Sequence, residues 1–107
     1  MRGVLVEEYT DFKNLTLQEC PEPKLTSSAV RIKIQAAGVS FATSLVVAGK
    51  YQRKPPVPFT PGTECSGYVV EVGADVDDID IGDRVCAVLD WGGQAEEVVA
   101  HAATVFH

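Results

Sequence analysis

The chain has 107 residues, enough for one domain with a modest core and too few for an added dinucleotide-binding domain. Hydrophobic residues make up 46% and charged residues 22%, which is ordinary for a globular protein and argues against disorder. The net charge of −6 disfavours nucleic acid and an anionic membrane surface as partners, because both attract basic proteins.

No apolar run reaches the ~18 residues that cross a bilayer. Residues 1–9 carry charges too close to a short apolar patch for a signal peptide, so we expect a cytoplasmic protein. Cys20, Cys65 and Cys86 are odd in number, far apart and without a C-x-x-C pair. They predict reduced, partly buried thiols and neither a disulfide framework nor a structural zinc knuckle.

Strand patterns dominate the first third of the chain. Apolar residues cluster within residues 1–9, and they alternate with polar residues over 15–19, which predicts two strands. The clearest strand is Ala29–Ala37, where apolar residues alternate with Arg31, Lys33 and Gln35. This period of two predicts one face on a core and one face in water.

One helix interrupts the strands. Apolar residues at helical spacing over Ser40–Gly49 predict it, with Ser40 as N-cap and Gly49 as the C′ residue. The following segment, Arg53–Gly62, holds four prolines. Such a segment is stiff and extended, so we expect a shaped loop.

The second half predicts more strands, over Thr63–Val72, Arg84–Leu89 and Ala95–Ala100. The acidic tract Asp75–Asp80 is expected to be a surface connection. Short strands with one helix indicate a compact β-barrel or sandwich. The apolar residues at 104–107 end abruptly, without the usual polar taper, which predicts a fragment of a longer protein.

Four segments together carry a family resemblance. They are Ala37–Phe41 (AGVSF), Pro61–Gly73 (PGTECSGYVVEVG), Gly82–Val85 (GDRV) and Gly92–Val99 (GGQAEEVV). In order and spacing they resemble the N-terminal catalytic domain of medium-chain dehydrogenases/reductases. With Gly49-Lys50-Tyr51 and the proline-rich loop, the chain is most similar to the zinc-independent quinone oxidoreductase and enoyl reductase branch.

The resemblance implies a mainly β fold, a GroES-like β-barrel with one short helix. Residues 1–107 would be a truncated catalytic domain of the alcohol dehydrogenase N-terminal type, from a two-domain α/β oxidoreductase whose Rossmann domain is missing. The implied activity is NAD(P)H-dependent hydride transfer to quinones or α,β-unsaturated carbonyls. NADPH or NADH would be bound mainly by the missing domain, so the fragment alone is expected to be inactive. The full-length protein would be a homodimer that binds a small-molecule carbonyl or quinone.

A metal site is not expected. In the zinc-dependent branch a Cys stands at the position of Ser40 and a His at that of Thr63, and neutral hydroxyls are poor zinc ligands. The four-cysteine lobe of that branch would follow Val85, where only Cys86 is present.

Without zinc, hydrogen-bond donors must stabilise the negative charge on the substrate oxygen. Tyr51 is the first candidate, with a half-buried packing role as its alternative. Ser40 and Thr43 are further catalytic candidates, although many relatives have Asn and Asp there, and Ser40 also fits a helix cap. Thr63 and Ser40 are candidates for contacts with the nicotinamide end of the cofactor. Glu64 is expected to be partly buried in a structural ion pair.

Two alternatives remain. A stand-alone GroES-like barrel could act as a binding or co-chaperonin-type protein, although a co-chaperonin needs a mobile apolar loop and this loop is stiffened by prolines. A family member that has lost activity also fits, because of the departures at Ser40 and Thr43. Fold resemblance alone does not decide between them.

Overall fold

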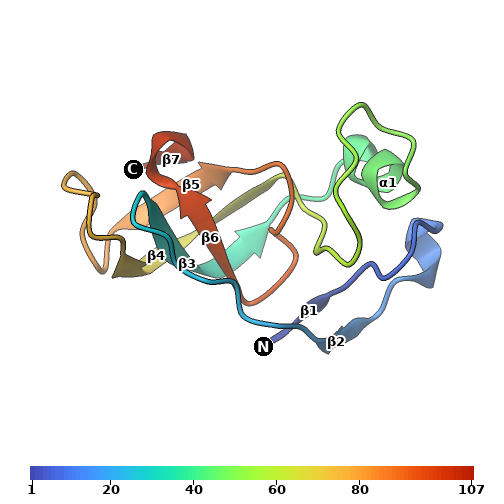
Figure 1. Ribbon diagram of the computed structural model, residues 1–107, viewed down its shortest axis with the longest axis horizontal. Helices are drawn as coiled ribbons and strands as arrows, with labels where there is room; N and C mark the ends of the chain where they lie inside the picture. The colour runs from blue at the N-terminus through green and yellow to red at the C-terminus, as the bar shows by residue number, and fades with distance from the viewer.

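The computed structural model describes residues 1–107 and contains two antiparallel sheets (Figure 1). The small sheet pairs β1 (Arg2–Val4) with β2 (Leu17–Glu19). The large sheet has the strand order β6-β3-β4-β5-β7. Its strands are β3 (Ala29–Ala37), β4 (Glu64–Val72), β5 (Arg84–Val88), β6 (Glu97–His101) and β7 (Val105–Phe106).

One α-helix, α1 (Phe41–Val47), and two short 3₁₀ helices, η1 (Phe12–Asn14) and η2 (Ala102–Thr104), complete the fold. The predicted mainly β fold with one short α-helix is therefore confirmed. No helix in the structure has both the length and the apolar character that a membrane crossing requires.

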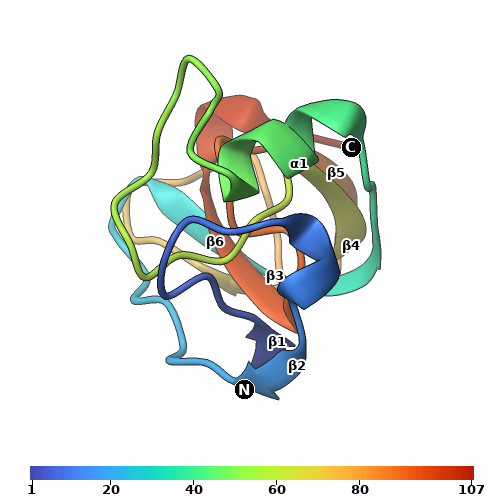
Figure 2. The ribbon, with the colours of Figure 1, turned by 90° about the vertical axis from the view of Figure 1, so that its right-hand side faces the viewer.

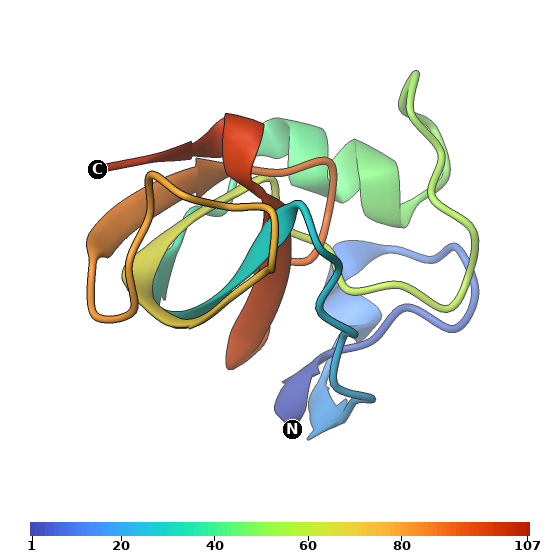
Figure 3. The ribbon, with the colours of Figure 1, turned by 60° about the vertical axis from the view of Figure 1, so that its left-hand side comes forward.

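The large sheet curls around its core, as Figure 3 shows. The pairing of β3 with β4 shifts register twice, between Arg31 and Ile32 and between Ile34 and Ala36. Such bulges bend a strand and increase its twist, which lets two nine-residue strands wrap. The enclosed core consists of Val30, Ile32, Cys65, Val69, Ile79, Val85, Ala87, Val98, Ala100 and Val105.

A second, smaller apolar cluster holds α1 in place. Val46 and Val47 of α1 pack with Val6 and Phe59, so the helix contacts both the N-terminal segment and the proline-rich loop. The chain around Val6 and Phe59 forms an isolated antiparallel bridge. Figure 2 shows the loop after α1 standing out from the body of the molecule. The helix and this loop therefore form a lobe at one end of the long axis, with the curled sheet at the other (Figure 1).

Most predicted elements lie where the sequence placed them. The strand Ala29–Ala37 has the predicted bounds, and Ser40 is the N-cap of α1. Gly49 has φ of 71°, the left-handed conformation that ends a helix and favours glycine. The first strand is shorter than predicted, because only Arg2–Val4 finds a partner strand.

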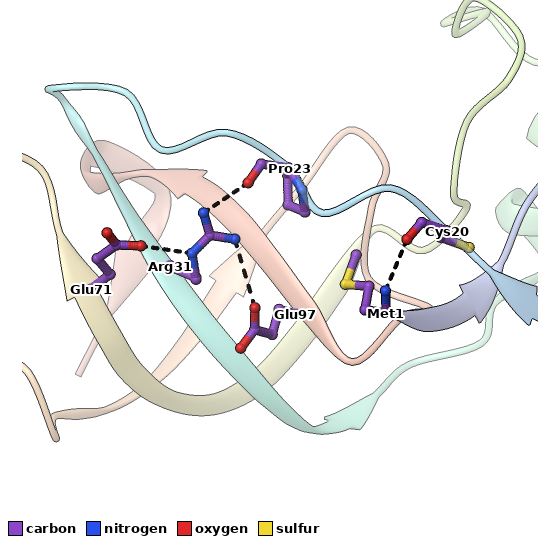
Figure 4. A network of polar contacts seen from close by, with 6 residues as sticks. All are labelled: Met1, Cys20, Pro23, Arg31, Glu71 and Glu97. Carbon is purple, nitrogen blue, oxygen red and sulfur yellow. Dashed lines mark hydrogen bonds and ion pairs between the residues drawn. The ribbon is translucent and has the colours of Figure 1, made fainter.

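The predicted water-facing side of β3 is confirmed at Lys33 and Gln35, which are exposed, but not at Arg31. Its side chain is only 16% exposed. The guanidinium lies 2.8 Å from Glu71 on β4 and 3.7 Å from Glu97 on β6, and it donates to the Pro23 carbonyl at 2.8 Å. Figure 4 shows this network, together with the hydrogen bond from the Met1 amino group to the Cys20 carbonyl. The segment after β2 thus covers part of the outer face.

Candidate functional site

Two of the predicted site residues, Tyr51 and Thr63, line one cavity of about 790 Å³. This volume lies within the range of roughly 300–1,000 Å³ typical of ligand pockets. Contributions come from α1, the loop after it, the residue before β4 and the turn after β5. The lining residues are Ala42, Val46, Tyr51, Gln52, Arg53, Lys54, Thr63, Leu89 and Asp90.

Local backbone geometry carries Tyr51 into this cavity. The Lys50 N–H donates to the Leu45 carbonyl at 2.8 Å, which closes the last turn of α1 around Gly49. The chain therefore reverses directly before Tyr51. The far end of the loop is fixed by the Tyr9 hydroxyl, which donates to the Pro55 carbonyl at 2.6 Å.

Thr63 reaches the cavity from the other side. It directly precedes β4, and its carbonyl accepts a hydrogen bond from the Leu89 N–H at 2.8 Å. This bond holds Thr63 and Leu89 together at the end of β5. The end of α1 thus positions Tyr51, and the pairing of β4 with β5 positions Thr63.

The cavity combines an apolar wall with hydrogen-bond donors. Ala42, Val46 and Leu89 supply the wall, while Tyr51 and Thr63 supply hydroxyls and Gln52 an amide. Tyr51 is 40% exposed, so a ligand in the cavity can contact this residue. Such a site can receive a flat, partly apolar molecule and donate hydrogen bonds to its oxygen.

Ser40 and Thr43 lie elsewhere, at the N-terminus of α1. The Thr43 N–H donates to Ser40 Oγ at 3.3 Å, and the two hydroxyl oxygens lie 3.2 Å apart. Thr43 is 5% exposed. Neither residue lines the cavity of Tyr51 and Thr63, so the structure does not bring the four predicted residues together. Ser40 caps the helix here, and its catalytic role stays a prediction.

Glu64 departs from its expected environment. It is exposed, whereas a partly buried carboxylate in an ion pair was predicted. It packs closely against Gly38, whose missing side chain leaves room for it, and its carbonyl accepts from the Gly38 N–H at 3.3 Å. Water can satisfy the charge of Glu64, so no ion pair is required.

The cysteines divide into two environments. Cys20 and Cys65 are buried, while Cys86 is exposed, which corrects the expectation that all three are partly buried. Burial raises the pKa of Cys65 to about 11, with a further contribution from Cys86. The structure gathers no group of three or more His, Cys, Asp or Glu side chains suited to a metal ion.

Three charged residues of the cavity were missed by the sequence analysis. Arg53 and Lys54 come from the loop after α1, and Asp90 comes from the turn after β5. Arg53 Nη1 lies 2.8 Å from Asp90 Oδ2. The three cations within Lys50–Lys54, in a chain of net charge −6, were the signal that could have pointed to this loop.

Comparison with known proteins decides the family. Residues 26–107 match the family described as the alcohol dehydrogenase GroES-like domain. The chain belongs to this family. The predicted relation of this GroES-like domain to medium-chain dehydrogenases/reductases is thereby confirmed.

Curated relatives of the domain include quinone oxidoreductase-like proteins. Quinone oxidoreductase-like protein 2 of Rattus norvegicus is 42% identical over 92 residues, which are 86% of this chain and 26% of the relative. A homolog of that protein from Nematostella vectensis is 51% identical over 76 residues, 70% of this chain and 21% of the relative. The domain thus spans about a quarter of the length of these relatives.

Solved structures agree with this relation. The human synaptic vesicle membrane protein VAT-1 homolog-like protein has a TM-score of 0.91 at 31% identity, over 99% of this chain and 34% of that chain. The mycobacterial protein Rv1454c, complexed with NADPH, has a TM-score of 0.88 at 31% identity, over 99% of this chain and 33% of that chain. The GroES-like fold is therefore shared over nearly the whole length of this chain.

Proposed function

We propose that this chain is the substrate-side domain of an NAD(P)H-dependent, zinc-free oxidoreductase that reduces quinones or α,β-unsaturated carbonyls. The observation that carries the proposal is the cavity that Tyr51 and Thr63 line together with the apolar residues Ala42, Val46 and Leu89. The relatives named quinone oxidoreductase-like support the substrate class. The mycobacterial complex with NADPH supports the cofactor.

When bound, NAD(P)H would supply a hydride to a ring or alkene carbon of the substrate, so that negative charge would develop on the carbonyl oxygen. A quinone that gains this hydride and one proton from solvent would become a hydroquinone. Tyr51 donates a hydrogen bond to the developing oxyanion, the interaction that stabilises such a transition state.

The residues of this domain fit only one end of a dinucleotide. A Gly-rich turn between a strand and a helix N-terminus normally holds the phosphates, and the segment before α1 is Val39-Ser40, without such a turn. The cavity wall and the Thr63 hydroxyl suit the flat nicotinamide end. We therefore propose that residues 1–107 are a truncated catalytic domain, and that a Rossmann domain of the full-length protein binds the rest of the cofactor.

Ser40 and Thr43 are proposed as further hydroxyls of the catalytic set. One of the two hydroxyls donates to the other at 3.2 Å, which leaves the accepting hydroxyl free to donate to a substrate. No zinc is needed in this proposal, because hydrogen bonds activate the carbonyl. The proposed full-length enzyme is a cytoplasmic homodimer.

The test begins with the mass of the native protein, detected in extract with an antibody against this chain. A band well above 11.5 kDa is expected. The purified full-length protein should then oxidise NAD(P)H with quinones and enones as acceptors. A native band at 11.5 kDa, or no NAD(P)H oxidation with either class of acceptor, contradicts the proposal.

The role of Tyr51 is tested by Tyr51→Phe in the full-length protein. We expect kcat to fall at least about tenfold, because one donor to the oxyanion is lost. Tyr68→Phe is the matched control, since Tyr68 on β4 has a similar exposure, 36% against 40%, and lies outside the cavity. An equal kcat for both variants would return Tyr51 to a packing role.

A further inference from the structure

We infer that this cavity selects substrates that carry a negatively charged group, such as a carboxylate, phosphate or sulfonate, beside the reducible ring or enone. The inference rests on the proposed function and specifies its substrate class. Charge distribution, cavity lining and the geometry of Arg53 carry it.

The first observation is a segregation of charge along the chain. Residues 23–63 contain six of the nine basic residues and none of the fifteen acidic residues. This segment supplies α1 and the loop after it, which form one side of the cavity. Three of these six cations, Lys50, Arg53 and Lys54, lie in the loop after α1, so this side of the cavity carries positive charge in a chain of net charge −6.

The second observation places part of that charge at the cavity. Arg53 and Lys54 both line it. Lys54 Nζ lies 4.9 Å from the centre of the Tyr9 ring, a cation–π contact that helps to position it. Lys50 is exposed one residue before Tyr51. An anionic group would meet these cations while its ring lies against the apolar wall.

The third observation concerns Asp90, the one carboxylate that lines the cavity. It bonds Arg53 Nη1 at 2.8 Å, but both side chains are more than half exposed, 64% for Arg53 and 58% for Asp90. Exposed ion pairs of this kind are weak, so a substrate anion can compete with Asp90 for the guanidinium. A guanidinium also has five N–H donors, which lets it hold two anions at once. Asp90 thus orients Arg53 and weakens anion binding.

The test measures binding to the full-length protein by calorimetry, so that it does not depend on hydride transfer. The probes are 1,4-naphthoquinone and its 2-sulfonate, which share a ring and differ in charge. We expect the sulfonate to bind about tenfold more tightly, as a charge-assisted bidentate contact predicts. The preference for the sulfonate should shrink severalfold at high salt, because Arg53 and Lys54 are near the surface and salt screens their charges.

Four variants locate the preference. Arg53→Gln and Lys54→Gln should each reduce the ratio of the two dissociation constants, and Asp90→Asn should increase it. Arg84→Gln is the matched control. This substitution removes the same charge, from an exposed residue that lies outside the cavity. It should leave the ratio unchanged. Equal affinities for the two probes, or an equal effect of Arg84→Gln and Arg53→Gln, overturn the inference.

Two further measurements distinguish this inference from binding of the cofactor phosphates and from the proposed function. The measurement is repeated with saturating NADPH, where a persisting sulfonate preference is expected. Its loss overturns the inference and assigns the cations to the phosphates of the cofactor. Reduction of both quinones without charge preference refutes the inference and leaves the proposed function standing. A charge preference in binding without any reduction refutes the proposed function alone.

Discussion

Cys65 and Cys86 show how two thiols on neighbouring strands acquire opposite chemistry. Cys65 on β4 is opposite Ala87, and Cys86 on β5 is opposite Ser66, so the two side chains lie on opposite faces of the sheet. Cys65 faces the core, where burial favours the neutral thiol and raises its pKa. Cys86 faces outward. Reactivity follows the thiolate, so the outward cysteine should react first.

We therefore predict that iodoacetamide at pH 8 alkylates Cys86 in the folded chain, and that Cys20 and Cys65 react only after unfolding. Mass spectrometry of peptides over time checks this order. Cys86→Ser should remove the fast reaction and leave the slow ones. Alkylation of Cys65 as fast as Cys86 under native conditions would contradict the assigned burial.

At the same scale, residue chemistry explains what the sequence could reveal of the site. Tyr51 and Thr63 were predicted through the family resemblance and lie in one cavity. Arg53 and Asp90 were missed because they are 37 positions apart, and only the folded chain brings the loop after α1 to the turn after β5. The exposure of Glu64 was also missed, since a sequence does not show which side of a strand end meets water.

At the scale of elements, the pairing of β3 with β4 depends on Gly67. It lies opposite Ile34, beside the second register shift, and a Cβ at this position would collide with the Lys33 carbonyl oxygen. The colliding atom is backbone of the partner strand, so the two strands would have to separate. The close approach of β3 to β4 in the curled sheet thus requires glycine at this position.

We predict that Gly67→Ala lowers the free energy of unfolding by about 1–3 kcal/mol, the usual cost of forcing atoms into packed space. Ser66→Ala is the control, because Ser66 is the exposed neighbour in the same strand. Urea denaturation of both variants measures the difference. Equal midpoints for the two variants would show that β3 can move away at little cost.

The elements that were predicted well have signals within their own residues. The alternation of Ala29–Ala37 and the cap at Ser40 are local patterns, and both elements formed as expected. The predicted length of the first strand was wrong because strand length depends on a partner. Residues beyond Val4 have no continuous partner strand, and Val6 pairs with Phe59 instead. The predicted exposure of Arg31 was wrong for a related reason, because the segment around Pro23, which lies outside the strand, covers this side chain.

At the scale of the whole molecule, two apolar clusters support different tasks. The ten-residue cluster inside the curled sheet stabilises the scaffold. The four-residue cluster around Val46, Val47 and Phe59 fixes α1 and the loop that carry Tyr51 and Arg53. Both clusters form entirely within this chain. The candidate cavity is therefore held by contacts that the domain itself supplies.

Because both apolar clusters form within this chain, we predict that the 107-residue chain folds alone but does not oxidise NADPH. Folding requires only the two clusters and the sheet hydrogen bonds, whereas tight cofactor binding requires a phosphate-binding turn that the chain lacks. Cooperative thermal unfolding of the purified chain, together with a flat NADPH absorbance in the presence of a quinone, is the expected result. NADPH oxidation that Tyr51→Phe abolishes would contradict it, because a contaminating reductase would be indifferent to that substitution. Such a result would mean that the cavity alone can bind the reacting ends of both cofactor and substrate.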